Sequence, residues 1–271
     1  MLESNSIGPR TLSLDEIGDE AVGGKAAGLA QLINMGLDVP PGFVIVNAQQ
    51  NNFPSDLTTR YTQIGQAKVA VRSSAIGEDG VSASFAGQYE TILDVEGLDQ
   101  LHKAINACVA SLHSEHAQQY SHEQSDVESP QMCVVVQTMV DAASAGVLFT
   151  ADPVSGRHDR MVIDAVAGLG EALVSGEQTP DHYELNLANA IVRQDLTAEA
   201  AILTEAQIST LAIDARKAAA ARGDHLDMEW AIDRSGQLHW LQARPITTLG
   251  CDLNDGFTPI AATDVITRCN V

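Results

Sequence analysis

Two segments near the C-terminal end of the sequence have the pattern of a β-hairpin with one polar face. They lie within residues 227–244, DMEWAIDRSGQLHWLQAR. If the central Ser-Gly pair forms a two-residue turn, Glu229 lies opposite Gln242, and Arg244 follows on the same face. A carboxylate beside an amide oxygen, with a guanidinium one rung further, suits a magnesium ion and the phosphates that it bridges. The alternative is a solvated hairpin face, because polar faces are the rule on half-buried sheets. The spacing does not decide between the two.

A Gly-Gly-Lys sequence at residues 23–25 stands at the start of a predicted helix. The free N–H groups of a helix N-terminus and the helix dipole favour an anion, and Lys25 adds a positive charge. The segment is not a Walker A loop, which needs a glycine where this chain has Asp19 and a Ser or Thr where it has Ala26. An ordinary turn that opens a helix is an equally good interpretation.

Arg72 lies at the polar end of a predicted strand and precedes a glycine- and serine-rich loop over residues 77–87. In that position it could hold a phosphate while the loop closes over it. The alternative is a strand-end arginine that pairs with one of many acids. Because the chain has only 15 Lys and Arg residues, the placement of Lys25, Arg72 and Arg244 at glycine turns or strand ends hints at a shared anion site.

The other reactive side chains form no recognisable catalytic or metal-binding motif. The eight histidines show no HExxH spacing, so we predict no histidine metal ligand; they are His102, His113, His116, His122, His158, His182, His225 and His239. The four cysteines form no CxxC pair and are expected to be buried, reduced thiols. GLGEAL at residues 168–173 lacks the third glycine of a dinucleotide fingerprint, and no regular βαβ unit surrounds it.

The composition predicts a folded protein with an acidic surface. Of the 271 residues, 45% are hydrophobic and 19% are charged, so the chain is too apolar for a disordered one. The net charge of -21 repels nucleic acid and anionic membranes, so we expect neither as a partner. The longest apolar cluster, around MCVVVQTMV, is far shorter than the roughly 18 residues that span a bilayer. With no apolar stretch at its start, the chain is expected to be cytoplasmic.

The predicted strands come in runs and the helices stand apart from them, which favours an α+β architecture. Apolar periodicity predicts three helices, one that ends at Gly36 and two over residues 98–121 and 205–222. Strands are predicted in VPPGFVIV, AKVAVRSS, TILDV, MCVVVQ, AGVLFT, RMVIDAV, HYELNL, AIVRQDL, DMEWAI and QLHWLQA, of which AKVAVRSS alternates clearly and VPPGFVIV begins with a turn. Residues 47–66 are polar and aperiodic and predict a loop or a short helix. We expect three parts: a first lobe over residues 1–130, a second lobe over 131–248, and a linker or tail over 249–271.

Four segments, in order over about residues 20–248, resemble a known family. They are VGGKAAGLAQLINMGLDVPPGFVIV, VAVRSSAIGEDGVSASFAGQYETIL, VVVQTMVDAASAGVLFTADPVSG and DMEWAIDRSGQLHWLQARPIT. They look like the N-terminal ATP-binding domain of phosphoenolpyruvate synthase, pyruvate phosphate dikinase and rifampin phosphotransferase. The resemblance implies a two-lobed ATP-grasp fold with mixed and antiparallel sheets, whose lobes clamp ATP with Mg²⁺. It also favours a magnesium and phosphate site at the hairpin over a solvated face, and an anion site at the Gly-Gly-Lys turn over an ordinary turn.

The resemblance implies a role for eight residues. They are Lys25 and Arg72 on the phosphates, Gly87 and Thr91 in the phosphate-covering loop, Gln137 in the hinge by the adenine, Glu229 and Gln242 on Mg²⁺, and Arg244 on the transferring phosphate. Arg72 and Arg244 are the predicted catalytic residues, because phosphoryl transfer needs dense positive charge against a bridging metal.

Family members pass the β-phosphoryl group of ATP to a histidine on a separate swivelling domain and release AMP, while the γ-phosphate goes to water or phosphate. The histidine then phosphorylates a substrate in a third domain. This sequence has no TSHA-type phosphohistidine motif and no substrate-binding barrel. We therefore expect a phosphotransferase subunit or fragment that needs a phosphohistidine swivelling domain or subunit and a substrate-binding domain or subunit.

Two other functions remain open at this point. One is an ATP-binding regulatory module without transfer activity. The other is an ATP-grasp carboxylate ligase, which would form ADP and an acyl phosphate, although the ARPIT ending argues against it. The segment between VPPGFVIV and VAVRSSA is short for the family, so part of the first lobe is expected to be trimmed.

Overall fold

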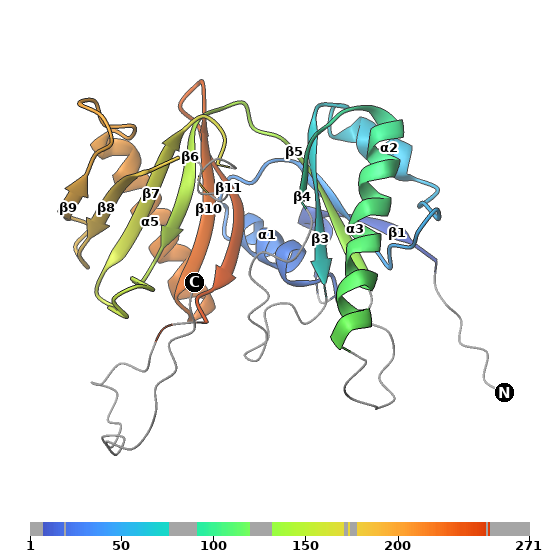
Figure 1. Ribbon diagram of the computed structural model, residues 1–271, viewed down its shortest axis with the longest axis horizontal. Helices are drawn as coiled ribbons and strands as arrows, with labels where there is room; N and C mark the ends of the chain where they lie inside the picture. The colour runs from blue at the N-terminus through green and yellow to red at the C-terminus, as the bar shows by residue number, and fades with distance from the viewer. Residues whose placement is uncertain are drawn as a thin grey trace, which may run out of the picture. The chain divides into compact units, whose positions relative to one another are not determined.

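The computed structural model of the chain describes residues 8–18, 20–75, 91–119, 132–170, 173, 178–247 and 249. Within them the backbone forms two sheets and four α-helices (Figure 1). The helices are α1 (Gly24–Asn34), α2 (Leu57–Gln63), α3 (Gly97–Gln119) and α5 (Glu205–Arg222), with a 3-10 helix η1 (Leu14–Glu16). The predicted α+β class is confirmed. Among the described residues, no helix is long and apolar enough to cross a membrane.

The first sheet has five strands in the order β1-β2-β5-β3-β4, and every neighbouring pair is antiparallel. The strands are β1 (Arg10–Ser13), β2 (Gly42–Val46), β3 (Val69–Ala75), β4 (Thr91–Val95) and β5 (Met132–Thr138). Strands β2 and β5 have the sequences GFVIV and MCVVVQT, and all of their residues except Thr138 are buried. Continuous apolar runs of this kind are expected where both faces of a strand are covered.

Alternation along β5 sends side chains into two separate cores, one on each face of the first sheet. Val134 and Val136 belong to a cluster with residues of α2 and α3. Cys133 and Val135 belong to a second cluster with residues of α1 and η1. Because successive residues of a strand point to opposite faces, α1 covers one face of this sheet and α2 and α3 cover the other.

The second sheet has six strands in the order β11-β10-β6-β7-β8-β9. They are β6 (Ala142–Phe149), β7 (Met161–Ala167), β8 (Asp181–Leu185), β9 (Ile191–Asp195), β10 (Leu226–Asp233) and β11 (Leu238–Pro245). The pairs β6–β7, β7–β8 and β8–β9 are antiparallel. Helix α5 begins with a capping box formed by Thr204 and Gln207 and ends before Gly223, which has the left-handed conformation.

The chain divides into two compact units by its internal contacts. The first unit is Met1–Ala143 with Trp230–Arg244, and the second is Ser144–Glu229 with Pro245–Val271. The chain therefore changes unit within β6, β10 and β11. The domain boundaries that we place near residues 130 and 248 stay a prediction.

The predicted helices over residues 98–121 and 205–222 are confirmed as α3 and α5. Residues 47–66, for which the sequence predicts a loop or a short helix, contain the short helix α2. The predicted site residues that the structure describes lie on α1, β3, β4, β5 and the β10–β11 hairpin.

Candidate functional site

The N-terminus of helix α1 is held against strand β3 by a glycine and a serine. Gly23 precedes the helix with a φ of 78°, and a Cβ atom there would lie 2.4 Å from the carbonyl oxygen of Ser74. The Ser74 hydroxyl donates a hydrogen bond to the Val22 carbonyl at 3.1 Å and accepts one from the Ala26 amide at 3.3 Å. Ser74 therefore takes the place of a helix-capping side chain and fixes the turn of helix that carries Lys25.

Arg72 lies two residues before Ser74 on β3, so both side chains are on the face that α1 covers. Antiparallel pairing places Arg72 opposite Val135 on β5 and opposite Thr91 on β4. Its Nη1 atom donates a hydrogen bond to the Leu241 carbonyl on β11 at 3.1 Å. Two predicted site residues, Arg72 and Thr91, are therefore cross-strand neighbours, and the arginine reaches the strand that carries two others.

Strand β11 lies against helix α1 through a second glycine contact. A Cβ atom at Gly28 would lie 2.4 Å from the carbonyl oxygen of Ala243, which stands between Gln242 and Arg244. Only a residue without a side chain lets the strand and the helix approach this closely. Three elements that carry predicted phosphate and metal ligands, α1, β3 and β11, thus meet within the first compact unit.

Gln137 lies near the end of β5 and is 3% exposed. Its backbone pairs with Gly42 on β2 and Ala70 on β3, and its Nε2 atom donates a hydrogen bond to the Pro40 carbonyl at 3.4 Å. The side chain that we predict beside the adenine is therefore fixed to the segment that connects α1 to β2.

The turn between β10 and β11 is one residue longer than the sequence pattern predicts. The Asp233 amide donates a hydrogen bond to the Gln237 carbonyl at 2.9 Å, and the Gly236 amide donates one to the Asp233 carbonyl at 2.9 Å. Asp233 therefore lies opposite Gln237, and the turn between them has three residues, with Gly236 at a φ of 89°. The predicted two-residue turn is therefore wrong, and Glu229 and Gln242 lie opposite each other only where a β-bulge shifts the ladder by one residue.

The side chain of Asp233 explains the longer turn. Its Oδ1 atom accepts hydrogen bonds from the amides of Ser235 at 2.8 Å and Gln237 at 2.9 Å, and from the Ser235 hydroxyl at 2.6 Å. The Nε2 atom of His239 lies 3.2 Å from the other carboxylate oxygen. These hydrogen bonds, first the one from the Ser235 hydroxyl and then the one from His239, hold the pKa of Asp233 well below its usual range.

Asp38 ties the same hairpin to the loop that follows α1. One of its carboxylate oxygens accepts a hydrogen bond from Gln237 at 3.0 Å, and its carbonyl accepts one from the Trp240 amide at 2.8 Å. No sequence motif marks Asp38 or the capping role of Ser74. The only sequence signal is a polar residue beside a glycine or proline turn, and the partner of Asp38 is 199 positions away.

The two predicted magnesium ligands lie on the hairpin strands. Glu229 on β10 is partly buried, and Gln242 on β11 is 4% exposed. In the part of the chain that the structure describes, no group of three or more His, Cys, Asp or Glu residues could hold a metal ion. Gly87, which we predict in the phosphate-covering loop, lies outside the described residues.

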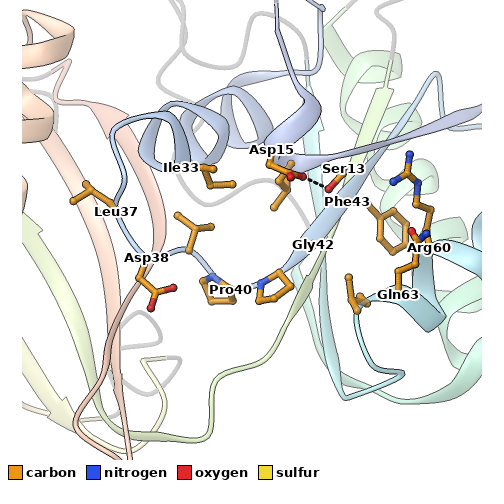
Figure 2. A pocket seen from close by; sticks show the side chains of 14 residues that line it. Ser13, Asp15, Ile33, Leu37, Asp38, Pro40, Gly42, Phe43, Arg60 and Gln63 are labelled. Carbon is orange, nitrogen blue, oxygen red and sulfur yellow. Dashed lines mark hydrogen bonds between the residues drawn. The ribbon is translucent and has the colours of Figure 1, made fainter.

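A pocket of about 420 Å³ lies within the first compact unit (Figure 2). Apolar side chains such as Ile33 and Phe43 line it together with the charged groups of Asp15, Asp38 and Arg60. None of the seven predicted site residues that the structure describes lines this pocket. The pocket and the predicted phosphate site are therefore separate features of the first unit.

The chain matches the family model described as pyruvate phosphate dikinase, AMP/ATP-binding domain, over residues 50–200 and 186–256. Among its relatives is the prodigiosin synthesizing transferase PigC of Serratia marcescens, 36% identical over 88% of this chain and 33% of that protein. A probable phosphoenolpyruvate synthase of Methanothermobacter thermautotrophicus is 33% identical over 88% of this chain and 45% of its own length. The rifampicin phosphotransferase of a Streptomyces species is 34% identical over 91% of this chain and 30% of that protein. The chain thus spans less than half the length of these relatives.

Solved structures with a similar backbone are more distant in sequence than these relatives. Biotin carboxylase of Campylobacter jejuni is 14% identical, with a TM-score of 0.44 over 81% of this chain and 39% of that one. The L-amino acid ligase of Bacillus licheniformis is 11% identical, with a TM-score of 0.46 over 83% of this chain and 43% of that one.

Proposed function

Because the chain belongs to the family of pyruvate phosphate dikinase AMP/ATP-binding domains, which has the ATP-grasp fold, we propose that it supplies the ATP-dependent half-reaction of a dikinase-type phosphotransferase. In this proposal the β-phosphoryl group of ATP passes to a histidine on a separate swivelling domain or partner, and AMP is released. The match to the AMP/ATP-binding domain over most of the chain is the observation that carries the proposal. Since the chain spans less than half of its relatives, the acceptor histidine and the final substrate site are assigned to other domains or subunits.

The phosphates of ATP are assigned to the place where α1, β3 and β11 meet. Lys25 stands in the first turn of α1, where N–H groups without intrahelical partners and the helix dipole favour an anion. Arg72 and Thr91 are paired across β3 and β4, and Arg244 follows the Ala243 contact on β11. In a chain with a net charge of -21, this local concentration of cations supports an anion site here. Gly87 is assigned to the loop over the same phosphates.

Mg²⁺ is assigned to Glu229 and Gln242, whose carboxylate and amide oxygens are the hard donors that this ion prefers. Two protein ligands are enough, because Mg²⁺ in nucleotide sites usually takes its other ligands from phosphates and water. The ion would neutralise charge that develops on the transferring phosphoryl group. Adenine recognition is assigned to Gln137 and the adjoining segment at Pro40, which its side chain binds.

The residues of this chain then act by position and charge. Arg72 is held by the Leu241 carbonyl, so its guanidinium is preorganised and does not have to be ordered when ATP binds. Arg244 lies one residue beyond Ala243, whose carbonyl faces Gly28. Both arginines are proposed to stabilise negative charge on the moving phosphoryl group, a role that is worth about 10²–10³ in rate when a single donor is removed.

The test uses the full chain, ATP labelled at the β-phosphate, and a partner protein that carries a swivelling histidine domain. We expect AMP and a labelled histidine on the partner, and a rate about 10²–10³-fold lower for Arg72→Ala. Lys68→Ala is the matched control. Lys68 immediately precedes β3, and its exposed ammonium group pairs with Asp94 at 3.0 Å, so the substitution removes a cation beside the same strand but outside the proposed site. It should transfer like the parent chain.

The products also separate the alternatives. ADP in place of AMP would indicate ligase chemistry, and tight ATP binding without any product would favour the regulatory module. Equal losses in Arg72→Ala and Lys68→Ala would contradict the assigned phosphate site. For the metal, Glu229→Ala and Gln242→Ala should each weaken Mg²⁺-dependent binding of a non-hydrolysable ATP analogue, and the double variant should lose less than the sum. Fully additive losses would show that the two residues do not share an ion.

A further inference from the structure

Two histidines that are 67 residues apart in the sequence meet in the second compact unit. The Nε2 atom of His225 lies 3.1 Å from the Nδ1 atom of His158. The two rings are nearly perpendicular, with an interplanar angle of 87° and centroids 4.8 Å apart. Both residues are partly buried, so the pair remains accessible to solvent. The sequence gives no sign of this pair, because no motif spacing joins the two positions.

The backbone on each side of the pair is held in place. His225 immediately precedes β10, where the Leu226 amide donates to the Thr150 hydroxyl at 2.7 Å and the Thr150 amide donates to the Leu226 carbonyl at 2.9 Å. His158 follows a turn in which the Asp152 amide donates to the Arg157 carbonyl at 3.0 Å. The two imidazoles therefore come from anchored segments.

The Asp152 side chain strengthens that turn. Its Oδ1 atom accepts hydrogen bonds from the amides of Val154 at 2.9 Å and Ser155 at 3.3 Å, and the Ser155 hydroxyl donates to its other oxygen. Burial alone would raise the pKa of Asp152, but the hydrogen bonds from Ser155 and Val154 outweigh it and lower the pKa. The carboxylate is ionised at neutral pH and keeps the turn closed, which positions His158.

The separation of the two nitrogens matches the distance between two neighbouring ligand atoms in a metal coordination shell. With metal–nitrogen bonds of about 2.0–2.1 Å, two neighbouring nitrogen ligands lie about 2.9 Å apart at a right angle and about 3.4 Å apart in a tetrahedron. The observed 3.1 Å falls between these values. In addition, burial and then the nearby His158 ring lower the pKa of His225, against the opposing charge of Asp224. A neutral imidazole is the form that binds a metal.

From this geometry we propose that His158 and His225 form a chelating site for a borderline divalent cation such as Zn²⁺, Ni²⁺ or Cu²⁺. Imidazole nitrogen suits these ions, whereas Mg²⁺ prefers oxygen ligands. The ion replaces the hydrogen bond between the rings: the proton on the bridging nitrogen moves to the other nitrogen of its own ring, and both facing lone pairs bind the metal. Water completes the coordination shell, so the ion is exchangeable rather than structural.

The proposal is tested with Zn²⁺ and Cu²⁺ on the full chain without an affinity tag. Cys251 and Cys269 are replaced by serine in every sample, because thiolates bind the same ions. We expect Zn²⁺ to raise the thermal midpoint of unfolding of this parent chain. His158→Ala and His225→Ala should each lower the Zn²⁺ affinity at least about ten-fold, as the loss of a ligand must cost no less than the loss of a supporting residue. The Cu²⁺-loaded parent should show hyperfine coupling to two nitrogens.

A matched control and a second variant keep the result unambiguous. His102→Ala removes an imidazole that stacks on Phe53 in the first unit, with ring centroids 4.1 Å apart, and should bind Zn²⁺ like the parent. His225→Gln preserves polarity and most of the volume, so it separates loss of the ligand from loss of the fold, which circular dichroism without metal checks. Parent-like affinity in His158→Ala, His225→Ala or His225→Gln, or no Zn²⁺-dependent shift in the parent, would overturn the proposal.

Discussion

Replacing Gly28 by alanine tests whether the packing of α1 against β11 sets up the proposed phosphate site. The added Cβ atom would lie 2.4 Å from the Ala243 carbonyl oxygen, which is 1.0 Å short of the 3.4 Å at which ordinary van der Waals contact begins. The atom that blocks it belongs to the backbone, so no change of rotamer can relieve the overlap. Either the helix or the strand has to move.

The sign of the stability change is the informative quantity. At a helix position where the added methyl group meets no other atom, Gly→Ala stabilises the folded protein by about 1 kcal/mol, because alanine has the higher helix propensity. Overpacking costs about 1–3 kcal/mol, and a clash with backbone belongs at the upper end of that range. We therefore expect Gly28→Ala to lower the free energy of unfolding by about 2 kcal/mol. It should also weaken binding of a non-hydrolysable ATP analogue, because α1 carries Lys25 and β11 carries Arg244.

Denaturant unfolding and calorimetric titration with the ATP analogue measure the two effects. Gln31→Ala is the control, because Gln31 is exposed on the same helix and its replacement should change stability by less than about 0.5 kcal/mol. If Gly28→Ala is about 1 kcal/mol more stable than the parent and binds the analogue equally well, the close approach of α1 and β11 does not exist in solution, and the argument for a site at this junction fails.

Three further predictions concern single side chains. Asp181→Asn should cost about 1–3 kcal/mol in denaturant unfolding, because the buried carboxylate accepts hydrogen bonds from the amides of Thr197 at 2.8 Å and Ile202 at 2.9 Å. Burial would raise the pKa of Asp181, but these hydrogen bonds outweigh it and lower the pKa. The stabilisation by the carboxylate is therefore present above the unfolded-state pKa of about 3.9 and is lost as the pH falls through the lower folded-state pKa. The difference in unfolding free energy between Asp181→Asn and the parent should shrink over that range. Thr204→Ala should cost about 1 kcal/mol through loss of the α5 cap, measured the same way. Burial raises the pKa of Cys133 to about 11, so peptide mapping should find this thiol unlabelled by a maleimide until the chain is unfolded; labelling in the native state would contradict its burial.

Local patterns in the sequence predict the elements of this fold better than their arrangement. The periodicity of α3 and α5 and the apolar runs or alternation of the strands are properties of short segments, so they are visible without the structure. The order β1-β2-β5-β3-β4 is not visible in this way, because β5 pairs with β2 and β3, both of which lie far before it in the chain. No local signal specifies that insertion.

The candidate site shows the same division between local and long-range information. Lys25 and Arg72 are recognisable from their segments, Thr91 follows only from the family resemblance, and the structure places Arg72 and Thr91 opposite each other. Ser74, whose hydroxyl caps α1, and Asp38, which anchors the hairpin, act on residues that lie far away in the sequence. The predicted two-residue turn is wrong for a local reason: the Asp233 carboxylate accepts hydrogen bonds from the amides of the turn and favours three turn residues over two.

The two proposed cation sites differ in donor atoms, and this makes them separable. Glu229 and Gln242 offer oxygen, whereas His158 and His225 offer nitrogen. Mg²⁺ therefore competes poorly with Zn²⁺ at the histidine pair, and the part of the Zn²⁺ affinity that His158→Ala and His225→Ala remove in saturating Mg²⁺ reports on these two imidazoles. The histidine site also needs no nucleotide, because its argument rests on contacts within the second compact unit. Loss of Zn²⁺ binding in His225→Ala with unchanged ATP binding would establish a nitrogen site that operates independently of the phosphate chemistry, and the failure of either proposal would leave the other standing.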